Sequence, residues 1–85
     1  MFGSNKKQER AAKIARYNRD AAAEDKSARE HAKKIAGYKK MLKSGSSDPA
    51  GLRYLIREHE EDMRGAQLSA QDAREAAEQT RKWRL

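Results

Sequence analysis

Two histidines, His31 and His59, are the only imidazoles in the chain and the residues best suited to bind a metal ion. Glu24 and Asp62 would add carboxylates if the chain folds back on itself, and zinc takes His, Asp and Glu as ligands. The spacing argues against a metal, because no two histidines stand four residues apart on one helix. Histidines between two helices more often tune packing or register. We therefore expect no metal and no other cofactor.

Catalysis is not expected either. No Ser has a base at a diagnostic spacing, and the chain has no Cys. A molecule made of two helices also offers no concave pocket for a substrate. The sequence therefore predicts a non-catalytic interaction protein.

The net positive charge of the chain lies in its first half. Residues 1–43 hold 13 Lys or Arg and 5 Asp or Glu, a balance of +8, whereas residues 44–85 hold 7 and 8, a balance of −1. One row of cations recurs every seven residues and so shares one helix face. Such a row can follow a phosphate backbone, although many such rows are only solvated outer faces. The row comprises Arg19, Lys26, Lys33 and Lys40.

A second group of cations comes from the two ends of the chain. If the chain folds back on itself, these ends meet and their cations gather at one pole. Crowded like charges weaken a fold, so we expect an anionic partner there. Part of this crowding has a structural explanation, because the helix dipole stabilises cations at a helix C-terminus. The group comprises Lys6, Lys7, Arg10, Lys13, Arg16, Arg81, Lys82 and Arg84.

These cations make nucleic acid or another polyanion the first partner to consider. No zinc-finger spacing, aromatic RNA-binding segment or short helix-turn-helix is present, so nothing predicts sequence-specific reading. Tyr17 and Tyr38 would be able to stack on bases, but we expect them to pack beside the helix–helix seam. Across the hairpin, we expect solvated acidic partners for Lys33 and Lys34, namely Glu58, Glu60, Glu61 and Asp62.

Two other functions remain open. The chain would also serve as a structural or assembly component of a larger particle, for example a small virion or phage protein, that packs through Ala-rich faces against copies of itself or a larger protein. It would also serve as a small inhibitor or adaptor that docks one helix on another protein.

The composition specifies helices. Val is absent and Thr occurs once, so the residues favoured in strands are nearly missing, whereas Ala, Glu, Lys, Arg, Gln and Leu are good helix formers. Only 36% of residues are hydrophobic and 39% are charged. Because Ala brings little apolar area, we expect an all-α fold that is marginally stable alone or completed by self-association or a partner.

One segment, residues 44–48, separates two helix-forming stretches of the chain. Gly45 is suited to the left-handed conformation that ends helices, and Asp48 before Pro49 is a typical helix start. The sequence predicts one domain, residues 1–85, with helices over about 5–43 and about 49–83. Ser69-Ala70-Gln71-Asp72 resembles a capping box after Gly65, but the apolar pattern continues without a slip, which favours one unbroken second helix.

Apolar residues recur at alternating three- and four-residue spacing in both helices, which predicts a long antiparallel hairpin, a two-helix coiled coil. The expected seam residues of the first helix are Ile14, Ala21, Ala28, Ile35 and Leu42. Those of the second are Leu52, Ile56, His59, Met63, Ala66, Ala70, Ala73, Ala77 and Thr80. In the resulting register Leu42 faces Leu52, Tyr38 meets Leu55 and Ile56, and Trp83 covers Ala11.

The location is predicted only coarsely. The lack of Cys, of a signal-peptide core and of any apolar run near the ~18 residues that span a bilayer fits the cytoplasm, another intracellular site or the inside of a virion. An Ala-based apolar face is too weak to insert into lipid. We therefore expect no membrane partner.

Overall fold

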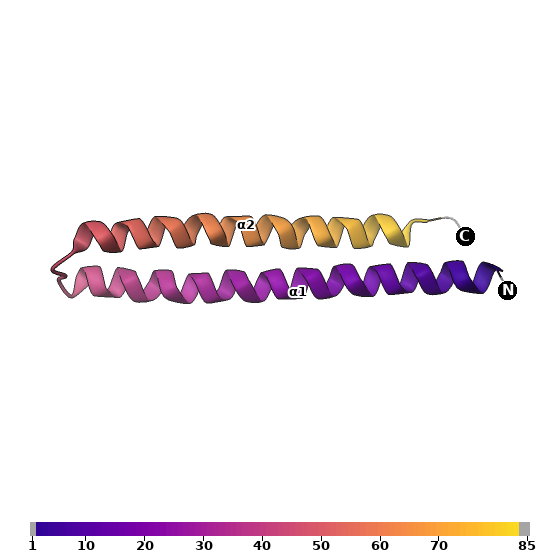
Figure 1. Ribbon diagram of the computed structural model, residues 1–85, viewed down its shortest axis with the longest axis horizontal. Helices are drawn as coiled ribbons and strands as arrows, with labels where there is room; N and C mark the ends of the chain where they lie inside the picture. The colour runs from indigo at the N-terminus through magenta and orange to yellow at the C-terminus, as the bar shows by residue number, and fades with distance from the viewer. Residues whose placement is uncertain (1, 84–85) are drawn as a thin grey trace.

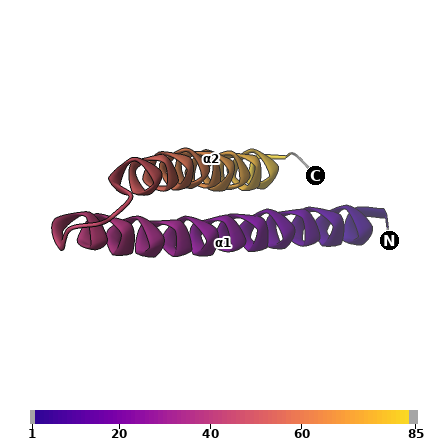
Figure 2. The same ribbon diagram turned by 60° about the vertical axis from the view of Figure 1, so that its left-hand side comes forward.

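Two long antiparallel helices make up the molecule. A computed structural model describes residues 2–83, with side chains from Asn5 to Trp83. Helix α1 spans Phe2–Lys43 and helix α2 spans Pro49–Arg81, and they lie side by side in both views (Figures 1 and 2). The predicted all-α antiparallel hairpin is confirmed. Compared with the expected bounds, α1 begins three residues earlier and α2 ends two residues earlier.

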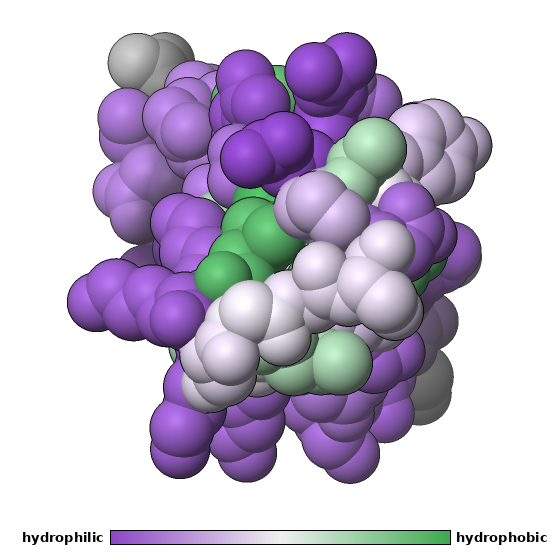
Figure 3. Space-filling model, turned by 90° about the vertical axis from the view of Figure 1, so that its left-hand side faces the viewer, coloured by the Kyte–Doolittle hydropathy of each residue, from purple (hydrophilic) through white to green (hydrophobic). Residues whose placement is uncertain are grey.

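The turn between the helices uses the glycine and the helix-capping residues that the sequence predicts. Gly45 has a φ of 87°, a backbone conformation that glycine adopts without steric strain. Its N–H donates to the Leu42 carbonyl at 3.3 Å. Asp48 caps α2, since its Oδ1 accepts the N–H of Gly51 at 3.0 Å, and Pro49 is the first helical residue. Figure 3 looks onto this end, where hydrophobic residues emerge among mostly hydrophilic ones.

The seam between the helices is narrow and mostly made of alanine. Every seam position predicted from the sequence is buried or half-buried. Large apolar side chains are concentrated near the turn, whereas small ones fill the middle and the open end, so the helices bury little area along most of their length. The buried positions are Ala21, Ala28 and Ile35 of α1 and Leu52, Ile56, Ala66, Ala70, Ala77 and Thr80 of α2.

Helix α2 is continuous, as its unbroken apolar pattern predicts. The segment from Gly65 to Asp72 lies within the helix, so the capping-box sequence is not used as a helix start. Near the open end, the buried Thr80 hydroxyl donates to the Ala76 carbonyl at 2.8 Å. This bond satisfies a polar atom that would otherwise weaken the seam.

Leu55 and Trp83 are more exposed than the expected register implies. Leu55 is 38% exposed, because neighbouring helical residues point about 100° apart and Ile56 takes the buried direction. Trp83 does not cover Ala11, which is exposed. Since α2 ends at Arg81, the Trp83 ring lies beyond the helix, where the Lys13 ammonium sits 4.6 Å from its centroid.

Helix α1 runs past the end of α2. The contact between Lys13 and Trp83 marks where α2 stops along α1, and the turns of α1 before Lys13 have no helix beside them (Figure 1). At ~1.5 Å per residue, this overhang is about 16 Å long. Within residues 2–83, neither helix has a stretch of apolar residues sufficient to cross a bilayer.

Candidate nucleic-acid interface

A basic stripe follows the outer face of α1. It consists of four exposed cations, and within residues 5–83 none of them forms an ion pair. Each stands five residues after a seam residue, which turns it about 140° away from α2. From first to last the stripe covers about 31 Å. The stripe residues are Arg19, Lys26, Lys33 and Lys40.

A basic pole lies at the open end of the hairpin. Lys6 and Lys7 are exposed on the first turns of α1, whereas Arg10 is half-buried. The remaining described members lie near the end of α2, and Arg84 lies outside the described residues. Since α2 ends at Arg81, the described cations of the pole are spread along the first turns of α1 and the end of α2. The other described members are Lys13, Arg16, Arg81 and Lys82.

The cations of this pole on α1 lack neutralising neighbours. From residue 6 to residue 19 the chain has six Lys or Arg and one carboxylate, Glu9. The first turn of α1 contains no acidic residue, so its positive helix dipole adds to the cationic side chains. Arg81 differs, since it pairs with Glu78 at 3.5 Å on the surface of α2 and lies at the favourable C-terminal end of that helix.

Carboxylates mark the middle of the hairpin instead. An open hollow there is lined by Asp20 and Glu24 of α1 and by Asp72 of α2. Arg74 of α2 forms an ion pair with Asp25 of α1, a contact that the sequence interpretation missed. Within residues 5–83 no ion pair joins Lys33 or Lys34 to the acidic residues expected beside them, which are Glu58, Glu60, Glu61 and Asp62. A polyanion would therefore meet carboxylates at the middle of the seam, and cations without ion pairs on the outer face of α1.

The tyrosines of α1 lie beside the seam. Tyr38 is half-buried and stacks on His59, with ring centroids 5.7 Å apart and planes inclined by 30°. Tyr17 is also half-buried and lines the acidic hollow. Both side chains are engaged in packing, so neither offers an open ring for base stacking.

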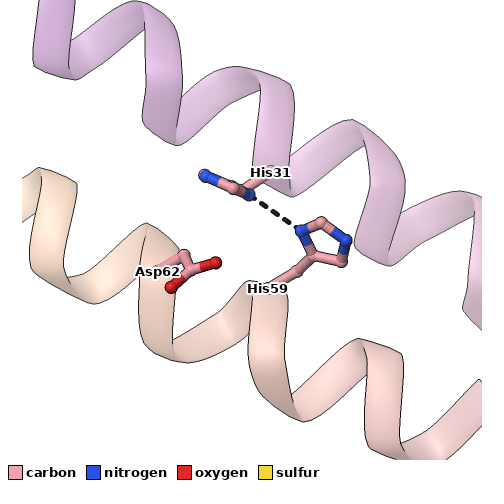
Figure 4. Close-up of side chains that lie close together, drawn as sticks. All are labelled: His31, His59 and Asp62. Atoms are coloured by element: carbon pink, nitrogen blue, oxygen red, sulfur yellow. Dashed lines mark hydrogen bonds between the residues drawn. The ribbon is translucent and has the colours of Figure 1, made fainter.

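The two histidines meet across the seam. The Nδ1 atoms of His31 and His59 are 2.8 Å apart and hydrogen-bonded (Figure 4). Asp62 lies one turn from His59, and one ligand atom from each of the three side chains falls within 4.8 Å of the others. Glu24 belongs to the acidic hollow rather than to this group. The three residues are hereafter called the histidine cluster.

No protein-family model, curated protein or solved structure matches this chain.

Proposed function

We propose that the chain is a non-catalytic helical hairpin that binds nucleic acid or another polyanion through the basic pole and the basic stripe. The observation that carries this proposal is the overhang of α1. There Lys6, Lys7 and Arg10 stand beside one carboxylate, Glu9, at the positive end of a helix dipole. Such an arrangement weakens the free helix. An anionic partner would neutralise these cations and so remove their mutual repulsion. Each phosphate contact would in addition release condensed counterions, which favours binding.

The stripe supports the same function through its shape. Its four exposed cations lie on one helix over about 31 Å, and their spacing from the seam residues turns them away from α2. An extended partner with regularly spaced negative charge fits such a row better than a single small anion does. Because α2 contributes little to this face, the partner is expected to lie along α1.

Binding is expected to be independent of base sequence. Cations contact phosphates without reading bases, and Tyr38 is stacked on His59 while Tyr17 faces the seam hollow. The stripe on α1 thus offers charge alone, and the exposed ring at the pole, Trp83, stands against Lys13. Affinity is expected to follow charge density and salt concentration.

The direct experiment is a fluorescence-anisotropy titration of labelled single-stranded DNA, double-stranded DNA and RNA, each in two unrelated sequences, with heparin as competitor. We expect affinity to fall steeply and linearly on a log–log plot against salt, with no more than a small difference between sequences. Failure to bind any of these polyanions near 50 mM salt, or binding that salt does not weaken, would refute the proposal.

A second candidate function, assembly into a larger particle, rests on exposed apolar residues of α2. Tyr54 and Leu68 are each 61% exposed and stand two heptads apart, hence on one side of the helix. The seam alanines are already covered within the hairpin, so packing between copies would use this outer side instead. Light scattering across a concentration series tests it, because Tyr54→Ser with Leu68→Ser should restore a monomer if this side joins copies.

A further inference from the structure

The histidine cluster sits midway along the hairpin and draws one side chain from α1 and two from α2. His31 comes from α1, whereas His59 and Asp62 come from α2 (Figure 4). Both imidazoles are half-buried and Asp62 is exposed. The cluster is therefore held in place on its seam side and open to solvent at the carboxylate.

The hydrogen bond within the cluster defines the chemistry of its two rings. Of two nitrogens 2.8 Å apart, one must donate a proton and the other must accept it. The accepting Nδ1 atom therefore directs its lone pair toward the N–H of the other ring. When a metal ion takes the place of that proton, the proton moves to Nε2 of the ring that carried it, and both neutral rings then direct an Nδ1 lone pair at the ion.

We propose that His31, His59 and Asp62 bind one divalent transition-metal ion, zinc in particular, which links α1 to α2. Two imidazole nitrogens and one carboxylate oxygen form a recognised zinc ligand set, with a water molecule in the fourth position. Magnesium and calcium are poorer candidates because they prefer oxygen ligands. This assignment replaces the sequence-based expectation of a metal-free pair.

The geometry requires only small side-chain adjustments. With zinc–nitrogen bonds of ~2.0–2.1 Å, tetrahedral coordination would hold the two Nδ1 atoms about 3.3 Å apart. The observed separation is 2.8 Å, so the rings must open slightly to admit the ion. Asp62 is exposed and free to turn toward it. Tyr38 stacks on His59 and limits the motion of that ring, which favours a preformed site.

A metal here would stabilise the weakest part of the fold. From this point toward the open end, the buried seam residues are alanines and Thr80. Zinc binds the folded arrangement of three residues from two helices, whereas the unfolded chain does not hold them together. Binding therefore shifts the equilibrium toward the hairpin by mass action.

The test is isothermal titration calorimetry of metal-free protein with zinc chloride, together with thermal melts followed by circular dichroism. We expect one zinc per chain and a rise in Tm of at least about 5 °C with zinc in large excess, reversed by a chelator. Magnesium at the same concentration should leave the Tm unchanged.

Three variants locate the site. His31→Gln removes a ligand from α1, Asp62→Asn removes the exposed ligand with little risk to folding, and Asp72→Asn makes the same chemical change at an exposed position on the same helix. The first two should weaken zinc binding at least about tenfold, whereas Asp72→Asn should bind zinc like the original protein. The proposal is overturned if the original protein takes up no zinc, if Asp62→Asn retains full affinity, or if Asp72→Asn loses as much.

Discussion

The ammonium group of Lys13 lies 4.6 Å from the centroid of the Trp83 ring, at the point where the end of α2 meets α1. This contact fixes how far α2 extends along its partner. It leaves Lys6 and Lys7 exposed on the first turns of α1, with the half-buried Arg10 following them toward Lys13. The surface that we propose for polyanion binding therefore begins beside the single tryptophan of the chain.

Trp83 should report binding at the pole. It is 42% exposed and held beside a cation, so a polyanion that engages this region will change the surroundings of its indole. We expect the tryptophan emission to change during a titration with heparin, with the same midpoint as the anisotropy signal. Binding detected by anisotropy with no change in emission would place the contact away from the pole.

Stability should depend on the few large apolar residues near the turn. Leu52 is 7% exposed, and Leu52→Ala should lower the free energy of unfolding by about 2–3 kcal/mol through lost burial and a residual cavity. Leu68→Ala makes the same change on the same helix at a residue that is 61% exposed, and should cost no more than about 0.5 kcal/mol. Urea unfolding measures both, and equal losses would contradict the burial pattern.

Two glycines of α2 should respond oppositely to alanine. At Gly65 nothing lies within 4 Å of an added Cβ, so Gly65→Ala should stabilise the helix by about 0.5–1 kcal/mol. At Gly51 the added Cβ would come 2.3 Å from the Asp48 carboxylate that caps α2. Gly51→Ala should therefore displace the cap and give no gain. Thermal melts decide the matter, and similar gains for both would show that the cap contributes little.

The sequence was sufficient to predict the elements and the buried face of each helix. Heptad spacing placed Ala21, Ala28 and Ile35 in the seam because a helix repeats its direction about every seven residues. Asp48 and Pro49 identified the start of α2, since capping depends on neighbouring residues alone. These features are local or periodic and need no knowledge of the other helix.

Contacts between the helices were harder to predict. Periodicity does not determine how far α2 extends along α1, so the overhang and the position of Trp83 were missed. The ion pair of Arg74 with Asp25 depends on side-chain directions across the seam, as does the hydrogen bond between His31 and His59. The register placed the two histidines close together, but whether they pack side by side or share a proton depends on rotamers that spacing does not specify.

Two triple variants with the same net charge test the central claim most directly. Lys6→Glu, Lys7→Glu and Arg16→Glu change exposed residues of the pole. The control changes exposed residues of α2 outside the proposed surface, and consists of Arg53→Glu, Arg57→Glu and Arg64→Glu. Both should keep the helical circular-dichroism spectrum, because exposed substitutions rarely cost more than about 0.5 kcal/mol each.

The measurement is the affinity of each protein for a labelled DNA duplex across a salt series. The pole variant should lose at least about tenfold in affinity, and the slope of log affinity against log salt should shrink by about one per contact removed. The α2 variant should have nearly the same affinity and the same salt dependence as the original protein. If the pole variant binds as tightly as the original protein, or if both variants lose affinity equally, the open end of the hairpin is not a polyanion-binding surface.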